Sequence, residues 1–176
     1  MGTVRSACDA VVVVLPPGCE WDGPPVAAAV DGGTSRSESV RAGLAAVPAS
    51  ADIIVVHDAA RPLVSRALLD AVVAVVRAGA DGAVPALPVA DTLKQVEGDR
   101  VRGTVERNGL VAVQTPQAFE AEMLRAAHRG GGEASDDAAL VEAVGGQVVV
   151  VPGDPLNLKI TTPHDLLHAA WIMREL

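Results

Sequence analysis

The chain has 176 residues, of which 49% are apolar and 20% charged, and its formal net charge at pH 7 is −8. This composition is typical of a single globular domain over residues 1–176 and excludes a disordered or fibrous chain. The acidic balance, without a basic run, argues against nucleic acid or an anionic membrane as a partner. No apolar run has the length of a membrane span, and two cysteines without metal-ligand spacing favour a reducing cytoplasm.

Apolar, β-branched runs predict the strands of a sheet. Because these runs are apolar on both faces, they favour a mostly parallel sheet with helices on both faces. Capping residues and glycine stops predict helices between them. The predicted strands are 10–15, 52–57, 82–87 and 147–151, and the predicted helices are 35–47, 65–75, 119–129, 135–145 and a last one from Thr162. The sequence therefore predicts an α/β domain.

Residues 91–115 interrupt this rhythm of strands and helices. The stretch from Thr92 to Val105 alternates in polarity around Glu97-Gly98-Asp99, which is typical of a β-hairpin. We expect a hairpin arm that extends from the sheet and hooks a substrate or a second subunit.

The segment after strand 52–57 carries the first candidate site. In an open parallel sheet, ligands bind beyond the carboxyl ends of the strands, and HDAARP at 57–62 places Asp58 and Arg61 there. An aspartate can hold Mg²⁺, and an arginine can bind a phosphate group through two hydrogen bonds. The alternative is that Asp58 and Arg61 only pair with each other and cap a turn.

Other polar positions are weaker candidates on their own. Gly32 and Gly33 precede a capped helix, whose N-terminus suits an anion or a nucleotide, although Gly-Gly before a helix is often only a turn. Lys159 is one of two lysines in a chain that otherwise uses arginine, which is either chance or a need for a compact ammonium. Arg107 either completes the pocket of a neighbouring subunit or is a solvated residue of the arm.

Taken together, an ordered set of motifs resembles one family. These motifs are Gly32-Gly33-x-x-Arg36-x-x-Ser39-Val40, HDAARP, DTLK at 91–94, TVERNGL at 104–110, QTPQAF at 114–119, SDDAALVE at 135–142 and NLKITTPHDL at 157–166. From about Val11 to the C-terminus they look like 2-C-methyl-D-erythritol 4-phosphate cytidylyltransferases. The resemblance implies a doubly wound, nucleotidyltransferase-like fold, a homodimer interlocked by the arm, and Mg²⁺-dependent transfer of CMP from CTP to a sugar-alcohol phosphate with release of pyrophosphate.

The resemblance also implies roles for individual residues. Asp58 is expected at the metal, and the cytidine side is expected to include Gly32, Gly33 and Ser39. The residues expected on the side of the methylerythritol phosphate are Arg61, Thr92, Arg107, Thr115 and Lys159, with Arg107 reaching in from the partner subunit. The expected catalytic set is Asp58, Arg61, Arg107 and Lys159.

One part of the family pattern is missing from this chain. The resemblance implies an initial strand and a glycine-rich loop whose cations hold the CTP triphosphate, and no such loop precedes Val11. We therefore expect an N-terminally truncated domain. Without the loop, one alternative is a non-catalytic module that binds the sugar-alcohol phosphate. Another alternative is a related pentitol-phosphate cytidylyltransferase, since the Gly-Gly and HDAARP regions would serve both enzymes.

Overall fold

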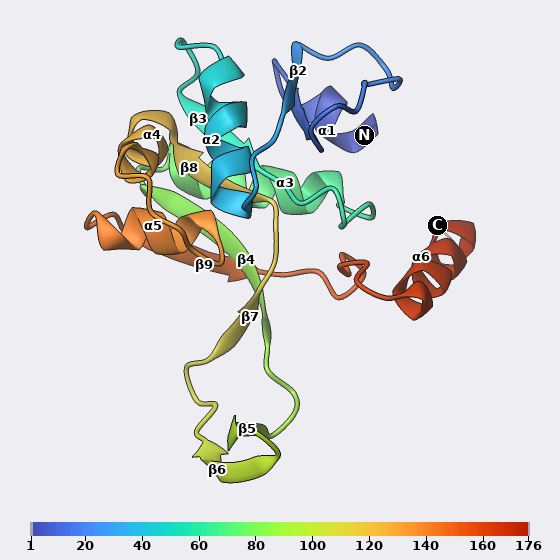
Figure 1. The fold of residues 1–176 in the computed structure, drawn as a ribbon, viewed down its shortest axis with the longest axis vertical. Helices are drawn as coiled ribbons and strands as arrows, with labels where there is room; N and C mark the ends of the chain where they lie inside the picture. The colour runs from blue at the N-terminus through green and yellow to red at the C-terminus, as the bar shows by residue number, and fades with distance from the viewer. Residues whose placement is uncertain (1, 176) are drawn as a thin grey trace.

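The computed structural model describes residues 2–175 as an α/β body with one long projection (Figure 1). The elements in chain order are α1 (Gly2–Ala7), β1 (Val12–Leu15), β2 (Ala28–Asp31), α2 (Arg36–Ala46), β3 (Ile53–Val56), α3 (Arg66–Arg77), β4 (Gly82–Pro88), β5 (Leu93–Glu97), β6 (Arg100–Val105), β7 (Val111–Val113), β8 (Gln117–Glu120), α4 (Ala121–Arg129), α5 (Asp137–Ala143), β9 (Val148–Pro152) and α6 (Pro163–Glu175).

The strands of the body form two separate sheets in the described residues. The larger has the order β3-β8-β4-β7, with β9 also paired to β4, and the smaller consists of β1 and β2. The predicted α/β fold is confirmed, but the large sheet is mixed. Only β4 and β9 pair in parallel there, whereas β8 is antiparallel to β3 and β4, and β7 is antiparallel to β4. The reason is that β7 and β8 return from the arm that β4 enters.

Helices cover both faces of the large sheet, as the sequence predicted. On one face, Ile54, Val84 and Phe119 form a buried cluster with residues of α2, α4 and α5. On the other face, Ala83 and Ala118 pack with Val72 and Val76 of α3. Neighbouring residues of one strand thus enter opposite clusters, as the twofold side-chain period of a strand requires.

Helix α2 joins the small sheet to the large one. Its Leu44 belongs to the cluster of Ile54 and Phe119. On the neighbouring residue, a Cβ at Gly43 would lie 2.9 Å from Val14 Cγ2 of β1, so the helix packs closely against the small sheet. The position of the segment before α2 therefore depends on contacts of this helix with both sheets.

Several elements differ from the sequence prediction. The strands β2, β7 and β8 and the short helix α1 were not predicted, and the helix predicted from Phe119 begins at Ala121. Phe119 lies in β8 because that segment pairs with both β3 and β4, and its ring is fully buried. Pairing in the sheet centre overrides the local helical pattern at this position.

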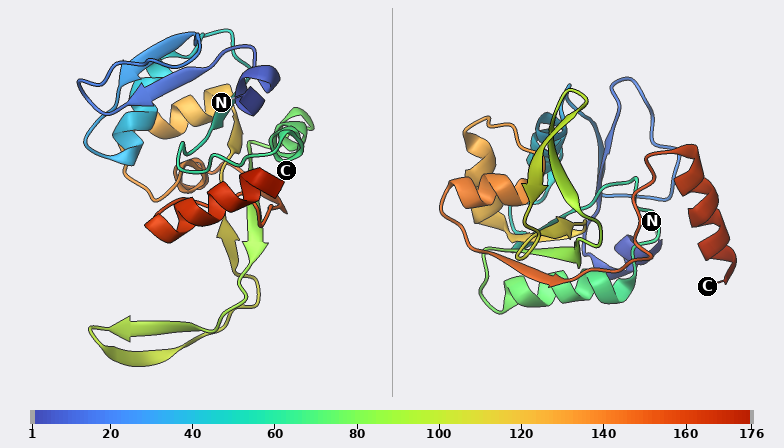
Figure 2. Two further views of the ribbon diagram at one scale, coloured as in Figure 1. Left: turned by 90° about the vertical axis from the view of Figure 1, so that its right-hand side faces the viewer. Right: turned by 90° about the horizontal axis from the view of Figure 1, so that it is seen from below.

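The predicted arm is present within residues 91–115. Strands β5 and β6 form an antiparallel hairpin, and the turn contains Gly98, whose φ of +59° is the left-handed conformation that glycine adopts without strain. The hairpin lies far from the body, at the end of two connecting strands (Figures 1 and 2). Its side chains therefore make few contacts with the sheet.

The last helix, α6, begins at a hydrogen-bonded cap. The Asp165 carboxylate accepts hydrogen bonds from the N–H groups of Thr161 and Thr162 and from the Thr161 hydroxyl, at 2.8–2.9 Å. These bonds lower the pKa of Asp165 to about 2. Among residues 2–175, no helix is long and apolar enough to cross a membrane.

Phe119→Ala should lower the free energy of unfolding by about 3–5 kcal/mol, because it empties a fully buried ring site shared by three helices. Trp171→Ala is the matched control, since Trp171 is 59% exposed, and it should change the value by less than about 0.5 kcal/mol. Urea denaturation measures both, and equal losses would contradict this location of the core.

Asp165→Asn should destabilise the chain in a pH-dependent way. Because folding lowers the pKa of Asp165 from 3.8 to about 2, its stabilising contribution is full above pH 3.8 and is lost as the pH falls through about 2. The difference in unfolding free energy between the wild type and Asp165→Asn should therefore shrink across this window. A difference that stays constant with pH would show that the ionised carboxylate is not the capping group.

Candidate active site

A pocket of about 230 Å³ opens where β3 ends. Three cations and two carboxylates lie in its wall, in a chain whose overall charge is −8. The lining residues are Arg36, Asp58, Arg61, Val113, Gln114, Thr115, Gln117, Ser135, Asp136 and Lys159. Four of the predicted site residues, Asp58, Arg61, Thr115 and Lys159, thus meet at one site.

Two loops are joined to bring these residues together. The Ile160 N–H donates to the Ala60 carbonyl at 2.8 Å, which fixes segment 157–160 beside segment 58–61. Asn157 is fully buried, and its side-chain Nδ2 donates to the Thr115 main-chain carbonyl at 2.8 Å. The main-chain carbonyl of Asn157 accepts from Arg61 Nη1 at 2.8 Å. The loop that carries Lys159 is therefore held at the carboxyl end of β3.

Asp58 lies between two cations. Lys159 Nζ donates to Asp58 Oδ2 at 2.8 Å, and Arg36 Nε lies 3.7 Å from Asp58 Oδ1. Burial opposes ionisation of Asp58, but the hydrogen bond and charge of Lys159, followed by the charges of Arg36 and Arg61, lower its pKa below 3.8. At neutral pH the pocket therefore holds an ionised carboxylate.

Arg61 and Thr115 are held by hydrogen bonds within the protein. Burial lowers the pKa of Arg61, while the nearby Asp58 carboxylate opposes that shift. The Thr115 hydroxyl accepts from the Asp58 N–H at 3.0 Å and also bonds to His57 Nδ1 at 3.0 Å. His57 Nε2 lies 3.0 Å from the Arg61 carbonyl, so His57 connects the two ends of segment 57–61. Burial lowers the pKa of His57.

The predicted cytidine side forms a tight loop before α2. A Cβ on Gly32 would lie 2.7 Å from Ser39 Oγ, and one on Gly33 would lie 2.2 Å from Glu38 Cβ, so only glycine fits at both positions. Ser39 Oγ accepts from the Gly33 N–H at 3.2 Å. The predicted N-cap is present, with Ser35 Oγ accepting from the Glu38 N–H. Ser39 therefore holds the glycine loop against the helix.

Thr92 and Arg107 lie on the arm, outside the lining of this pocket. Both are exposed, and Arg107 Nη1 donates to the carbonyls of Val89 and Ala90 at the base of the same arm. Within one chain, the structure does not bring these two predicted residues to Asp58.

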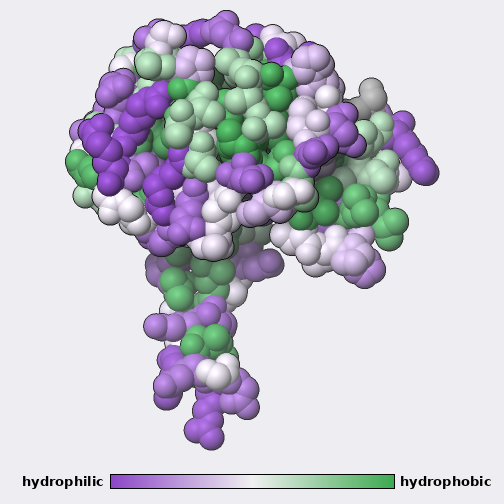
Figure 3. Space-filling model, turned by 45° about the horizontal axis from the view of Figure 1, so that its top comes forward, coloured by the Kyte–Doolittle hydropathy of each residue, from purple (hydrophilic) through white to green (hydrophobic). Residues whose placement is uncertain are grey.

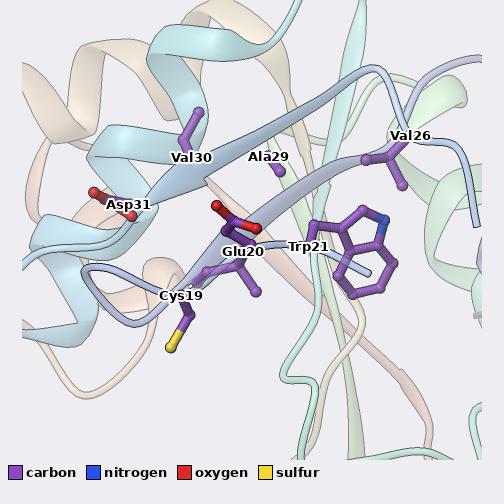
Figure 4. A pocket seen from close by; sticks show the side chains of 8 residues that line it. Cys19, Glu20, Trp21, Val26, Ala29, Val30 and Asp31 are labelled. Atoms are coloured by element: carbon purple, nitrogen blue, oxygen red, sulfur yellow. The ribbon is translucent and has the colours of Figure 1, made fainter. Parts of the chain in front are cut away.

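A second, wider hollow of about 560 Å³ lies beside β1 and β2 (Figure 4). Its lining includes the Trp21 ring and the carboxylates of Glu20 and Asp31. Two acidic groups without a lysine or arginine in the lining repel a phosphate group, so we assign the chemistry to the smaller pocket at Asp58.

Sequence reasoning left five polar lining residues without a role in the site: Arg36, Gln114, Gln117, Ser135 and Asp136. The position of Arg36 in the Gly32-Gly33-x-x-Arg36 motif could have indicated that it belongs to the site. Gln117 Nε2 donates to Asp136 Oδ2 at 2.9 Å, and this pair joins β8 to the N-terminus of α5. That contact spans two elements, so spacing in the sequence does not indicate it.

In the described residues, no group of three or more histidine, cysteine, aspartate or glutamate side chains is arranged to hold a metal ion. Mg²⁺ often uses only one or two protein carboxylates together with substrate phosphates and water. Asp58, with a side chain that is 19% exposed, fits that mode of binding.

Comparisons with known proteins identify the family that this chain resembles. The family model for 2-C-methyl-D-erythritol 4-phosphate cytidylyltransferase matches residues 4–175. A protein of that name from Nocardia farcinica is 50% identical over 166 residues, covering 94% of this chain and 69% of the relative. One from Streptomyces avermitilis is 50% identical over 152 residues, covering 82% of this chain and 61% of the relative.

The fold is shared as well. The crystal structure of the Thermus thermophilus enzyme of the same name superposes with a TM-score of 0.88 at 42% identity, covering 98% of this chain and 86% of that one. This chain spans 36% of a bifunctional enzyme IspD/IspF from Solidesulfovibrio magneticus. It thus spans between about a third and two thirds of several curated relatives. The match of nearly its whole length shows that the chain belongs to the 2-C-methyl-D-erythritol 4-phosphate cytidylyltransferase family.

Proposed function

We propose that the chain takes part in the transfer of CMP from CTP to 2-C-methyl-D-erythritol 4-phosphate, with release of pyrophosphate. The observation that carries this proposal is the cluster of Arg36, Arg61 and Lys159 around Asp58. A pocket with three cations in an otherwise acidic chain suits ligands that carry several phosphate groups.

The reaction needs no covalent intermediate on the protein. A phosphate oxygen of the acceptor attacks the α-phosphorus of CTP, a new P–O bond forms, and the bond to the β-phosphate bridging oxygen breaks as pyrophosphate leaves. The protein has to align the two substrates and stabilise the charge on the equatorial oxygens. We assign Arg61 and Lys159 to the acceptor phosphate, because the 44% exposed Lys159 side chain and the neighbouring Arg61 line the same pocket.

Mg²⁺ is the metal we propose for this site, with Asp58 as its protein ligand. The other ligands would be phosphate oxygens and water. When bound, the ion would neutralise charge on the CTP phosphates. On the cytidine side we propose Gly32, Gly33 and Ser39, whose loop lies at the start of the helix that begins with Arg36.

A homodimer formed through the arm is the proposed assembly. The arm and its base expose several large apolar side chains: Val96, Val101, Val105, Leu110, Val111 and Val113, each between 38% and 61% exposed. Figure 3 shows the arm as a narrow projection with apolar and hydrophilic residues side by side. A two-stranded hairpin is marginally stable alone in water, which supports a covering partner.

In such a dimer, Arg107 would reach into the partner's pocket, as the family resemblance implies. We propose the same for Thr92, because it lies exposed on the same arm and outside the pocket of its own chain. We place the chain in the cytoplasm, in keeping with Cys8 and Cys19, both of which are free.

Lys159→Ala should weaken binding of 2-C-methyl-D-erythritol 4-phosphate by about tenfold to a hundredfold, because it removes a charge-assisted contact to phosphate. Isothermal titration calorimetry measures the affinity, and a pyrophosphate-release assay with CTP and Mg²⁺ measures turnover. Asp58→Ala should abolish turnover. Arg66→Ala is the control, because Arg66 pairs with Asp70 on the exposed surface of α3 and should leave both unchanged.

Three results separate the candidate functions. Turnover with methylerythritol phosphate that disappears in Asp58→Ala supports the proposed reaction. Turnover only with a pentitol phosphate would assign the related cytidylyltransferase activity. Acceptor binding without pyrophosphate release would identify a binding module, and wild-type protein that binds no acceptor would contradict the proposal.

A further inference from the structure

Arg36 connects the Asp58 site to a buried pair of residues, Asp137 and His128, that the proposed reaction does not use. Its Nη2 donates to Asp137 Oδ2 at 2.7 Å, while its Nε lies 3.7 Å from Asp58 Oδ1. Asp137 is fully buried, and its Oδ1 lies 3.0 Å from Nε2 of His128, which is 4% exposed. One guanidinium thus contacts two carboxylates, of which one is in the pocket and the other is in the core.

We propose that Arg36 is a positioning residue for the cytidylyl transfer: anchored on Asp137, it fixes the orientation of the Asp58 carboxylate. This inference rests on the proposed function, because it concerns the same pocket. The chain of contacts runs from His128 in the last turn of α4, through Asp137 in the first turn of α5, to Arg36 and then Asp58.

The anchor is rigid because a buried carboxylate has few alternatives. Both oxygens of Asp137 are occupied, one by His128 and one by Arg36. Loss of a partner would leave a buried charge uncompensated, which is strongly unfavourable. Arg36 therefore cannot follow Asp58 if that side chain turns, and Asp58 is held between a fixed guanidinium and the more exposed Lys159 ammonium.

The same contacts hold the glycine loop beside the pocket. Arg36 is the first residue of α2 and follows the Ser35 cap, so the loop from Gly32 to Ser35 precedes it directly. The side chain of Arg36 ties the start of α2 to the start of α5. The loop proposed for cytidine and the carboxylate proposed for the metal therefore share one anchor.

A guanidinium is suited to this task in a way that an ammonium is not. Arginine presents several N–H donors in a planar fork, and here Nη2 and Nε face different carboxylates. A lysine has one nitrogen at its tip and can pair with Asp137 or approach Asp58, but not both in this geometry. In Arg36→Lys, the new ammonium can therefore still pair with the buried Asp137 carboxylate, while Asp58 loses its contact with residue 36 and keeps the one with Lys159.

Arg41 offers a matched control on the same helix. It also ties α2 to the segment before α5, through the Gly132 carbonyl and the Glu133 carboxylate, each at 2.9 Å. However, it does not line the pocket. If the role of Arg36 were only to fasten α2, Arg41→Lys would have a comparable effect.

The test is a double-mutant cycle in the pyrophosphate-release assay with saturating CTP, Mg²⁺ and 2-C-methyl-D-erythritol 4-phosphate. We expect Arg36→Lys to lower kcat about tenfold. Asp58→Asn keeps an oxygen ligand at position 58 and should therefore retain a measurable residual rate, unlike Asp58→Ala. In that background Arg36→Lys should lower kcat by less than about twofold, because the effect passes through the Asp58 carboxylate. Affinity for the acceptor, measured by calorimetry, should change less than kcat. Arg41→Lys should leave kcat within about twofold of the wild type.

Equal losses of kcat from Arg36→Lys in the wild-type and Asp58→Asn backgrounds would overturn the inference, as would an equal loss in Arg41→Lys. Urea denaturation of the same four proteins of the cycle gives a readout that does not depend on activity. Coupling between Arg36 and Asp58 in the unfolding free energy supports the contact, and its absence contradicts it. An inactive wild type with intact coupling would mean that the proposed function has failed and not the contact.

Discussion

An ionised carboxylate at the end of a buried strand is the constraint around which this pocket is arranged. Asp58 is only 19% exposed, so its charge needs compensation from nearby cations. Arg36 comes from α2 and Lys159 from the segment before α6, and they lie on the two sides of the carboxylate. Segments more than 100 residues apart in the chain therefore have to meet at one sheet edge for the charge of Asp58 to be stable.

These segments are held together by hydrogen bonds within the protein, and we assign these bonds no part in the reaction. Asn157 is fully buried and joins the Lys159 loop to Thr115 and Arg61, while the Thr115 hydroxyl holds the Asp58 N–H. Thr115 was predicted at the substrate, and in the structure its hydroxyl is bonded inside the protein. Its contact with substrate stays a prediction, whereas its support of Asp58 is a feature of the fold.

The arm poses a different physical problem from the pocket. It exposes valines such as Val96 and Val101 at 59% and 61%. Within residues 2–175, strands β5 and β6 of the arm pair only with each other. Little in the body stabilises it. The roles proposed for Thr92 and Arg107 therefore depend on a second chain. If these roles are right, the substrate site is complete only when the dimer has formed.

Much of this molecule is readable from its sequence. The apolar runs at 52–57, 82–87 and 147–151 predicted three strands of the large sheet because they are continuously apolar. Burial in the structure is less complete than this pattern suggests, since Val149 and Val150 of β9 are 42% and 53% exposed. The arm was predicted from a different local pattern, the alternation of polar and apolar residues on both sides of the Glu97-Gly98-Asp99 turn. Asp58 and Lys159 were identified by the motifs that contain them, and the structure places their charged groups 2.8 Å apart.

Tertiary structure alone decided the mixed character of the sheet, the strand at Phe119 and the partners of Arg36. Residues 117–120 become a strand because β3 and β4 lie on either side of them, and no local pattern records those neighbours. The link from Arg36 to Asp137 spans 101 residues. Local sequence sets backbone preference and burial pattern, whereas the pairing of distant charges is determined only when packing removes them from water.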